Sequence, residues 1–402
     1  AMTQTPTPDW QAARAAMHLD PTIANLNTGS FGPLPKVVFD RATELRKRLA
    51  EEPMDFFVRR LPPLLWEARR RLAEFVGTDP RRLIFTCNVT TSINIVAGSL
   101  QLSGPGEILL TDHEYLAMQW CWERAAQRQG LTVRTFPLPV LAEDPTEIID
   151  AFREAMTERT RLLFFSHVLS PTGLVLPARA ICAEARRRGV LTVVDGAHAP
   201  AMVPVQVDAM GCDFYGANCH KWLLAPTGAG FLVLGEGNQD RLQPLQVSWG
   251  WHPDRARFDE PDEFGSTPRL RFYEFEGTRD CSPWLAVPEA IAFQETLGFA
   301  AIRQRNECLV EYVHKLFGDK LGLAAATPRH PDLHGFLTAF RLPEHVLAPE
   351  LRQGLWERFR VEAPVVERPD GMLIRVSTHF YNTEAEIDRL GEALRTLVLC
   401  HS

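Results

Sequence analysis

Hydrophobic residues follow two different spacings along the first 280 positions. Segments 64–77 and 177–189 carry apolar residues three, four or seven positions apart, which predicts helices that end at Gly77 and Gly189. Four short apolar runs have instead the length of buried strands: 82–86, 107–111, 161–168 and 190–195. Because strands that alternate with helices pair side by side, this order predicts a parallel sheet with helices on both faces.

The pattern changes after about residue 280. A long helical stretch is interrupted at Pro288 and Gly298, and two short strand-like runs and a last helix from about Thr383 follow it. A chain of 402 residues is long for one hydrophobic core, so two packed lobes are expected. We therefore divide the chain into an N-terminal segment, a large α/β domain and a smaller C-terminal α+β domain: 1–30, 31–280 and 281–402.

Composition and charge narrow the class of protein. Lys and Arg number 43 and Asp and Glu 50, so the net charge of −7 lacks the basic excess that nonspecific nucleic-acid binding needs. The first ten residues carry neither the basic nor the apolar region of a secretory signal, and no apolar run approaches the roughly 18 residues of a membrane helix. We therefore expect no membrane partner. The 8 cysteines show no metal-ligand spacing, so we also expect free thiols, no metal site and a cytoplasmic location.

Reactive side chains fall at the predicted carboxyl ends of strands, where open α/β sheets bind ligands. Asp195 ends an apolar run, His198 follows three residues later, and Lys221 follows the next short apolar segment. Thr90 and Thr91 stand where a strand gives way to a helix. The amides and the dipole of a helix N-terminus attract phosphate, so this turn is a candidate phosphate site.

These residue types match the needs of pyridoxal 5′-phosphate (PLP) chemistry. A desolvated lysine amine loses its proton easily and forms an imine with the cofactor's aldehyde. A carboxylate keeps the pyridine nitrogen protonated, and hydroxyls and amides hold the phosphate. Taken singly, Lys221 is typical of a surface lysine, Asp195 of a helix cap or a metal ligand, and the two threonines of caps. The order of phosphate loop, strand-end Asp and Lys favours PLP.

Longer stretches around these residues resemble a known family. VVDGAHAP, ANCHKWLLAPTGAGFL, LNTGSFGPLP, LLTDHEYLAM, SHVLSPTGLVLP, FEGTRD and RVSTHFYNT are similar to motifs of class V aminotransferases, which are fold-type I PLP enzymes. Within that group they resemble isopenicillin N epimerase-like proteins. The resemblance runs from about residue 25 to about residue 395. It implies a large PLP-binding domain with a mainly parallel sheet, a small C-terminal domain and an amino-acid substrate.

The resemblance also assigns roles residue by residue. Lys221 takes the place of the Schiff-base lysine, Asp195 that of the pyridinium partner, and Tyr115 that of the residue stacked on the ring. Arg375 matches the arginine that binds the substrate α-carboxylate. The expected catalytic set is Lys221, Tyr115, Asp195 and His198. The other expected contacts are Thr90, Thr91, Ser170, His198, His220, Gly277 and Thr278 to the cofactor, and Asn27, Gly29 and Trp249 to the substrate.

Some of these roles have a physical basis in the residues themselves. Arg375 lies in an otherwise apolar strand, where an unpaired cation is costly and a carboxylate ligand suits the guanidinium fork. An internal Asp or Glu partner is the alternative. Tyr115 can equally be a core aromatic, and His113 a satisfied loop histidine. Trp249 and Trp251 can pack in the fold instead of walling the substrate entrance.

The same resemblance bears on assembly and reaction. Gly277 and Thr278 match a motif that reaches the phosphate of a neighbouring subunit, so we expect a homodimer with shared active sites. Desulfurases of the family carry a nucleophilic cysteine near the carboxylate-binding arginine, and residues 336–380 contain no cysteine. The sequence therefore excludes desulfuration through an enzyme persulfide.

Three reactions remain, and all begin by removal of the α-proton from an external aldimine to give a quinonoid. We favour an amino-acid epimerase, because Lys221 and Tyr115 are expected on opposite faces of the ring. A C–S β-lyase, with His113 or His379 as acid, is the alternative, and an aminotransferase is a further one. A PLP-binding protein without turnover is least favoured, because the whole set of catalytic residue types is present.

Overall fold

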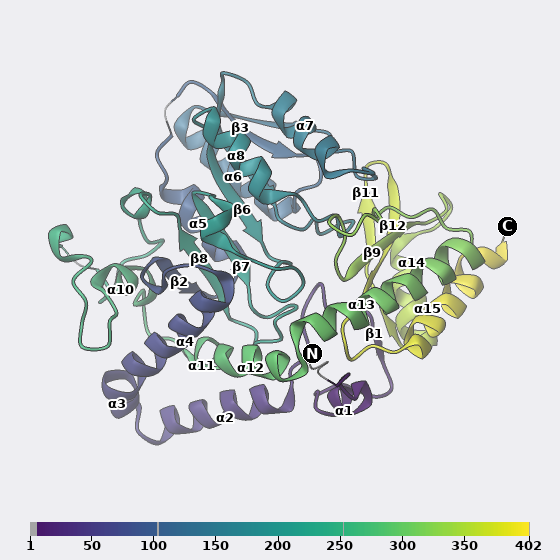
Figure 1. Cartoon of the computed structure of the whole chain (residues 1–402), viewed down its shortest axis with the longest axis horizontal. Coiled ribbons are helices and arrows are strands. Elements are labelled where there is room, and N and C mark those ends of the chain that lie inside the picture. The colour runs from purple at the N-terminus through teal and green to yellow at the C-terminus, as the bar shows by residue number, and fades with distance from the viewer. Residues whose placement is uncertain (1–5, 103, 252, 402) are drawn as a thin grey trace, which may run out of the picture.

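A seven-stranded sheet forms the centre of the large lobe in the computed structural model, which describes residues 6–102, 104–251 and 253–401 (Figure 1). Its order is β2 (Leu83–Thr86), β8 (Gly230–Leu234), β7 (Phe214–Asn218), β6 (Leu191–Gly196), β5 (Thr160–Ser166), β3 (Glu107–Thr111) and β4 (Thr132–Phe136). Neighbouring strands from β7 to β4 run parallel, and β8 runs antiparallel to both β7 and β2. The mainly parallel α/β sheet predicted from the sequence is confirmed.

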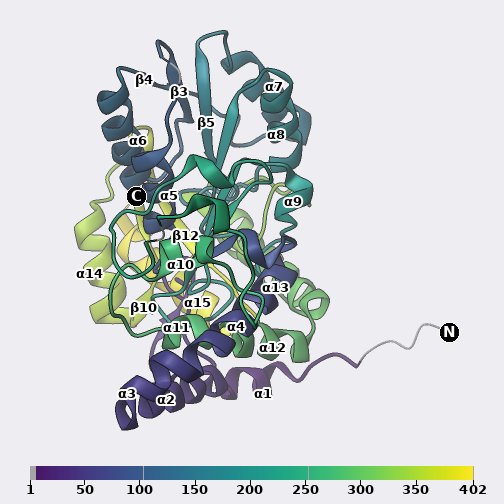
Figure 2. The same ribbon diagram turned by 90° about the vertical axis from the view of Figure 1, so that its left-hand side faces the viewer.

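Helices cover both faces of this sheet and one edge of the lobe. They are α2 (Lys36–Glu51), α3 (Pro53–Asp55), α4 (Leu61–Val76), α5 (Val89–Ser99), α6 (Leu116–Gln129), α7 (Pro145–Ala155), α8 (Ala178–Arg187), α9 (Val207–Met210), α10 (Pro268–Glu274), α11 (Ser282–Leu285) and α12 (Val287–Leu297). Seen from the side, α6 lies on one side of β3 and β5, and α7 and α8 lie on the other (Figure 2).

Each face of the sheet has its own hydrophobic core. In β5, Leu162 and Phe164 belong to the core with α5 and α6, whereas Leu163 and Phe165 belong to the core with α7 and α8. Successive side chains of a strand point to opposite faces, so a strand covered on both faces is apolar at every position. This is why the sequence shows continuous apolar runs here and no alternation.

The small lobe contains an antiparallel sheet in the order β11, β12, β9. The remaining elements of the chain are α1 (Trp10–Ala15), β1 (Ala24–Asn25), α13 (Phe299–Val313), β9 (Leu337–Arg341), α14 (Ala348–Phe359), β10 (Val361–Glu362), β11 (Val365–Arg368), β12 (Gly371–Ser377) and α15 (Glu384–Leu397). Short 3₁₀ or π-helical segments are Phe56–Arg60, Pro80–Arg82, Gln239–Arg241, Arg255–Arg257, His314–Lys320 and Leu399–His401.

Local signals set several helix ends. Gly77 ends α4 in the left-handed conformation (φ 71°), which a residue without a Cβ adopts at little cost. Thr383 and Glu386 form a reciprocal capping box at the start of α15, so the last helix begins where the sequence predicted.

Two parts of the chain pack elsewhere than the sequence led us to expect. α11 and α12 pack on α2 and α4 at the lower edge of the large lobe, so the chain leaves that lobe near Gly298 and not at residue 280 (Figure 1). β1 pairs with β10, and Leu26 lies in the core of the small lobe. The N-terminal segment 1–30, of which residues 1–5 lie outside the described ranges, therefore joins the small lobe.

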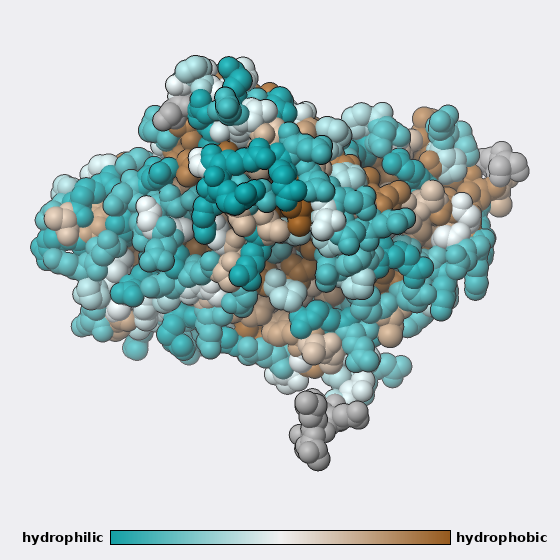
Figure 3. All heavy atoms as spheres, turned by 45° about the horizontal axis from the view of Figure 1, so that its top comes forward, coloured by the Kyte–Doolittle hydropathy of each residue, from teal (hydrophilic) through white to brown (hydrophobic). Residues whose placement is uncertain are grey.

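The surface and the helices give further information on the class of protein. One face of the molecule is mostly hydrophilic, with smaller hydrophobic patches (Figure 3). Among the described residues, no single helix has the length and apolar character to cross a membrane. Of the helices that the structure describes, only Ser282–Leu297 and Phe299–Lys320 have that length and character when taken together, and they are bent by 72° where they meet. Within the same ranges, no three His, Cys, Asp or Glu side chains are grouped to hold a metal ion.

Candidate active site

A cavity of about 530 Å³ lies at the carboxyl ends of β5, β6 and β7, where open α/β sheets bind ligands. Both lobes contribute to its wall, since Arg375 comes from β12 of the small lobe. The lining residues are Gly29, Ser30, Phe31, Cys87, Asn88, Val89, Thr90, Tyr115, Ser166, Val168, Ser170, Asp195, Ala197, His198, Asn218, His220, Lys221, Thr227, Gly228 and Arg375. Most of the residues that the sequence singled out therefore meet in one cavity.

Lys221 follows β7, and its Nζ lies 3.4 Å from Nε2 of His198. Burial lowers the pKa of the Lys221 amine to about 7; the charge of Arg375 also lowers it, and Asp195 opposes both. Near neutral pH, a large fraction of this amine is unprotonated. Both imine formation and proton abstraction need the amine in that form.

The N-terminal loop packs directly against the lysine segment. The Gly32 amide donates to the His220 carbonyl at 2.8 Å, and a Cβ on Gly32 would lie 2.1 Å from the Lys221 carbonyl oxygen. Gly29 lines the cavity as predicted, and a Cβ there would lie 3.2 Å from Nη2 of Arg375. Glycine at both positions lets the backbone approach the site closely.

Asp195 is the next-to-last residue of β6, and only 3% of its surface is exposed. Its Oδ1 accepts a hydrogen bond from the Ala197 amide at 2.9 Å. Burial raises the pKa of the Asp195 carboxyl to about 6, while this hydrogen bond and the charge of Lys221 lower it. A buried carboxylate of this kind suits a cationic partner such as a protonated ring nitrogen.

His198 is held in one tautomer by a residue that the sequence analysis missed. Its Nδ1 accepts a hydrogen bond from Nε1 of Trp222 at 3.2 Å, and because an indole N–H only donates, Nε2 carries the ring proton. Burial holds the pKa of His198 well below its ordinary value, so the ring is neutral near pH 7. The Nε2–H group therefore faces Lys221 as a hydrogen-bond donor.

The first turn of α5 borders the cavity where the sequence predicts a phosphate site. The Asn88 side chain caps the helix by accepting from the Thr91 amide at 2.8 Å, and the Val89 amide donates to Oδ1 of Asn218, also at 2.8 Å. Thr90 and His220 line the cavity beside this turn. Thr91 does not line it, because one helical step turns its side chain by about 100° from that of Thr90. The lining of the cavity therefore does not support its predicted place in the phosphate shell.

Arg375 is buried among neutral oxygens. Nη1 donates to the carbonyl and the hydroxyl of Ser170, at 2.8 and 3.1 Å, and Nη2 donates to Oδ1 of Asn27 at 3.3 Å and to Oγ of Ser30 at 3.4 Å. Its buried Nε has no partner in the part of the chain that the structure describes. The alternative of an internal carboxylate partner is not observed, and the cation is available for an anionic ligand. Asn27 acts through this contact and does not itself line the cavity.

Tyr115 lines the cavity from the residue before α6, with 55% of its surface exposed. The alternative that it is a core aromatic is wrong. Phe31, which the sequence analysis did not single out, lines the same cavity and is 68% exposed. Two large rings therefore stand partly uncovered at this site.

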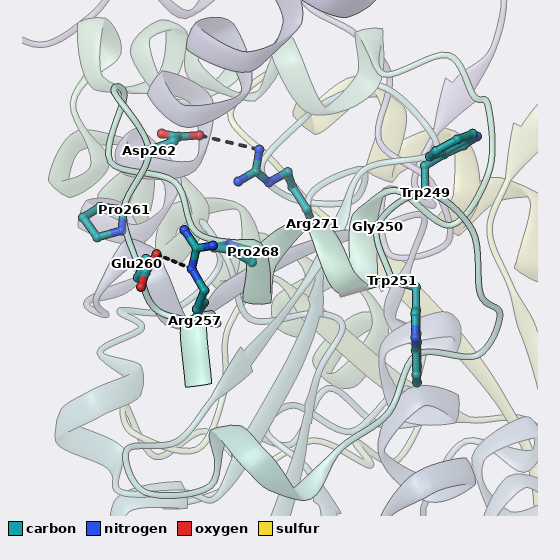
Figure 4. Close-up of a pocket in the computed structure, with 9 residues that line it drawn as sticks. All are labelled: Trp249, Gly250, Trp251, Arg257, Glu260, Pro261, Asp262, Pro268 and Arg271. Atoms are coloured by element: carbon teal, nitrogen blue, oxygen red, sulfur yellow. Dashed lines mark hydrogen bonds and ion pairs between the residues drawn. The ribbon is translucent and has the colours of Figure 1, made fainter. Parts of the chain in front are cut away.

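Trp249 lies in a different pocket from Lys221. That pocket has a volume of about 450 Å³, and Figure 4 shows Trp249 and Trp251 on one side of it, while Arg257 and Arg271 are directed to Glu260 and Asp262. Trp249 is 98% exposed, so its predicted contact with substrate is not present within one chain. Gly277 and Thr278 are also exposed and do not line the lysine cavity. Their predicted role concerns a neighbouring subunit.

Neither histidine proposed as an acid for the lyase alternative reaches the cavity. The His113 ring bonds to Oδ1 of Asp112 at 2.5 Å, as a satisfied loop histidine does. His379 is fully buried, and its Nε2 bonds to the Trp222 carbonyl at 3.0 Å. Burial lowers the pKa of His379 to about 4. Packing around Trp222 occupies this ring, so the expected acid role is wrong.

The cavity has the groups that PLP requires. Arg375 and Asp195 are buried, and the charge of each is costly unless a ligand completes its contacts. Lys221 can take the aldehyde, Asp195 the ring nitrogen, His198 a ring oxygen, and the α5 turn the phosphate. Most of this donor set comes from loops after neighbouring strands, as the sequence predicted.

Comparison with known proteins agrees with this geometry. Residues 33–346 match the aminotransferase class-V family. The chain is 55% identical over 391 residues to the isopenicillin N epimerase of Streptomyces clavuligerus, covering 97% of this chain and 98% of the relative. It is 56% identical over 392 residues to the isopenicillin N epimerase of Amycolatopsis lactamdurans, covering 96% and 98%.

Solved structures of the enzyme C-DES share the fold. A C-DES mutant with glycine covalently linked to the PLP cofactor has a TM-score of 0.81 at 26% identity, covering 97% of this chain and 100% of that one. The complex of the cystine C–S lyase C-DES with its product, cysteine persulfide, has a TM-score of 0.82 at 25% identity, covering 94% and 98%.

Proposed function

The chain belongs to the class V aminotransferase family, and from this premise we propose that it is a PLP-dependent epimerase that inverts the α-carbon of an amino-acid substrate. The observation that carries the proposal is the meeting of Lys221, Tyr115 and Arg375 in one cavity. The name shared by the two relatives at 55% and 56% identity supports isopenicillin N as the substrate.

Residues of this cavity would hold PLP at three points. Thr90 and His220 at the N-terminus of α5 suit the phosphate, Asp195 suits the ring nitrogen, and Lys221 suits the aldehyde carbon. When bound, PLP supplies an electron-accepting ring that acidifies the α-hydrogen of an attached amino acid.

The chain's own residues then bind the substrate and move the proton. Arg375 can receive the α-carboxylate, because its present partners are neutral and one nitrogen is free. A large fraction of the Lys221 amine is unprotonated near neutral pH, so Nζ can accept the α-proton. Inversion requires a second group that returns a proton from the other side, and the hydroxyl of Tyr115 is our candidate.

Deuterium labelling tests the reaction. Wild-type protein incubated with isopenicillin N in D₂O should give the inverted epimer with deuterium at Cα, which NMR and chiral chromatography detect. Tyr115→Phe should abolish inversion yet still exchange the α-hydrogen with retention. Tyr312→Phe is a matched control, because its hydroxyl bonds to Asp388 away from the cavity. Absence of Cα exchange in the wild type would refute the epimerase, and normal inversion by Tyr115→Phe would refute that residue's role.

A C–S β-lyase is the second candidate, and the similarity to the cystine C–S lyase C-DES favours it. A lyase acting on cystine or an amino-acid thioether would release a sulfur-containing product and a keto acid and leave no inverted amino acid. A keto acid formed only when an amino acceptor is present would indicate transamination. The same labelling experiment, repeated with cystine or an amino-acid thioether in place of isopenicillin N, distinguishes these outcomes.

We also propose a homodimer with shared active sites. Phe31 and Tyr115 line the cavity with large exposed rings, and Trp120 (60% exposed) and Trp249 add exposed apolar surface. Thr278 is exposed and outside its own chain's cavity, as a group serving a partner would be. A second copy covering these residues would complete the site.

Mixing of variants tests the shared site. Lys221→Ala and Thr278→Ala homodimers should both be impaired, whereas a hybrid dimer keeps one cavity free of both changes. Random mixing makes about half of the dimers hybrids, so about a quarter of wild-type activity should return. No recovery after exchange, or a fully active monomer in sedimentation analysis, would contradict this arrangement.

We further propose a cytoplasmic location, which the eight free cysteines support because reduced thiols are typical of that compartment. Fractionation of the source cells with immunodetection checks it, and recovery from the medium would contradict it.

A further inference from the structure

A second buried carboxyl group lies beside the cavity and has no part in the steps above. Glu114 is 3% exposed and directly precedes Tyr115. Its Oε1 accepts from Oγ1 of Thr111 at 2.7 Å and from the Ser166 amide at 3.2 Å, and its Oε2 accepts from Oγ of Ser166 at 2.6 Å. These donors are neutral, so they orient the carboxylate without cancelling its charge.

Ser166 connects this group to the cofactor site. It ends β5, lines the cavity, and stands opposite Asp195 in the parallel ladder between β5 and β6. Glu114 is therefore attached to the strand end next to the one that carries Asp195. Burial raises the pKa of Glu114 to about 7; the hydroxyls of Ser166 and Thr111 lower it, and the charge of Asp195 raises it. The two carboxyl groups thus influence each other's charge.

We propose that Glu114 is a positioning residue that strengthens the hold of Asp195 on a protonated pyridine nitrogen of PLP. The inference rests on the proposed function, because it requires PLP in this cavity. A second negative charge beside Asp195 favours a cation there, and in a site shielded from water this effect is only weakly screened. The alternative is a structural role, in which Glu114 only ties the start of α6 to β5.

Other titratable groups around Glu114 do not supply this charge. Asp195 faces it from β6, Arg375 is a cation on β12, and Lys221 beyond β7 is mostly neutral at pH 8.5 because its pKa is about 7. His198 is neutral near pH 7, and the ring of His113 bonds to the neighbouring Asp112. Asp112 is a further carboxylate, but it is bonded to the His113 ring, whereas Glu114 is bonded to Ser166 at the strand end beside Asp195.

Cofactor affinity separates the two roles without reference to turnover. Glu114→Gln keeps the size of the side chain and one accepting oxygen, and it removes the charge. The other oxygen becomes an NH2 donor, from which the hydroxyl of Ser166 can accept because a hydroxyl both donates and accepts. Dissociation constants of the cofactor-free protein are measured by tryptophan fluorescence for PLP and for its 1-deaza analogue, in which carbon replaces the ring nitrogen. At pH 8.5 the variant should bind PLP about tenfold more weakly. That factor corresponds to a change of about one unit in the pKa of the pyridine nitrogen. It should bind the analogue as wild type does.

The pH dependence gives a second check. At pH 6 Glu114 is mostly protonated in the wild type, since its pKa is about 7, and it then resembles the neutral glutamine. The difference in PLP affinity between wild type and variant should therefore shrink from pH 8.5 to pH 6. Glu107→Gln is the matched control. It removes another buried carboxylate from the opposite end of β3, where Arg134 binds it, and should leave the PLP-to-analogue affinity ratio unchanged.

Equal loss of affinity for PLP and for the analogue, or no loss for either, would overturn the inference and leave Glu114 a structural role. If Glu114→Gln fails to fold by circular dichroism, Glu114→Asp keeps the charge with altered hydrogen bonds. It should retain the wild-type affinity ratio, and a changed ratio would overturn the inference. A wild-type protein that binds no PLP would refute the proposed function itself, which is a different outcome.

Discussion

Replacing Lys221 by Met should stabilise the cofactor-free protein, although it removes the amine that PLP requires. The lysine amine has a pKa of 10.5 in the unfolded chain and of about 7 in the folded cavity, where burial and the charge of Arg375 disfavour the cation. Between these two values the unfolded chain binds one more proton than the folded protein. Stability therefore rises with pH across this range, and Lys221 is most destabilising at low pH.

The size of the effect follows from the same two values. A fall in pKa from 10.5 to about 7 costs about 5 kcal/mol at a pH well below both, because one pH unit of proton affinity equals about 1.4 kcal/mol. By the same relation the cost is about 3 kcal/mol at pH 8 and about 1 kcal/mol at pH 10. Methionine has a similar length and no charge, so Lys221→Met should recover these amounts.

Urea unfolding of the cofactor-free proteins at pH 8 and pH 10 measures the gain. Both pH values keep Asp195 ionised, since its pKa is about 6, so its titration does not contribute. Lys47→Met is the control, because that side chain is 68% exposed and its replacement should change the free energy of unfolding by no more than about 0.5 kcal/mol at either pH. A Lys221→Met protein less stable than wild type, or one whose gain is the same at both pH values, would refute the reasoning.

Three further changes test other parts of the site and the fold. Asp195→Asn should lower kcat with isopenicillin N by a factor of roughly 10²–10³ while PLP stays bound, because an amide cannot stabilise a protonated ring nitrogen. A rate within a few-fold of wild type would assign Asp195 a structural role. Arg375→Lys should raise KM by roughly tenfold or more and leave the cofactor spectrum unchanged, because an ammonium lacks the guanidinium fork. Loss of PLP from this variant would instead place Arg375 in the phosphate shell. Arg69→Met should lower the free energy of unfolding, measured by urea titration, by about 3–5 kcal/mol, because it leaves the charge of its ion-pair partner Glu274 uncompensated. Both side chains are only 1% exposed. A stability within about 1 kcal/mol of wild type would contradict this.

The sequence alone determined the sheet and the position of the site within it. Apolar runs define the strands, and in a parallel sheet the carboxyl ends of neighbouring strands meet at one edge. Asp195 and Lys221 each follow such a run, so their proximity could be predicted without coordinates. Thr90 and Thr91 similarly mark the helix N-terminus that borders the cavity, although Asn88 is the residue that caps it.

Only the tertiary structure decided which distant residues complete the site. Arg375 donates to Ser170, 205 positions earlier in the chain, and Trp222 fixes the tautomer of a histidine on another strand end. The spacing of apolar residues reports which face of an element is buried and does not report the partner that buries it. For the same reason the sequence could not show that Trp249 and Lys221 line different pockets, or that Glu114 bonds to the strand end beside Asp195. The course of a loop is set by long-range packing.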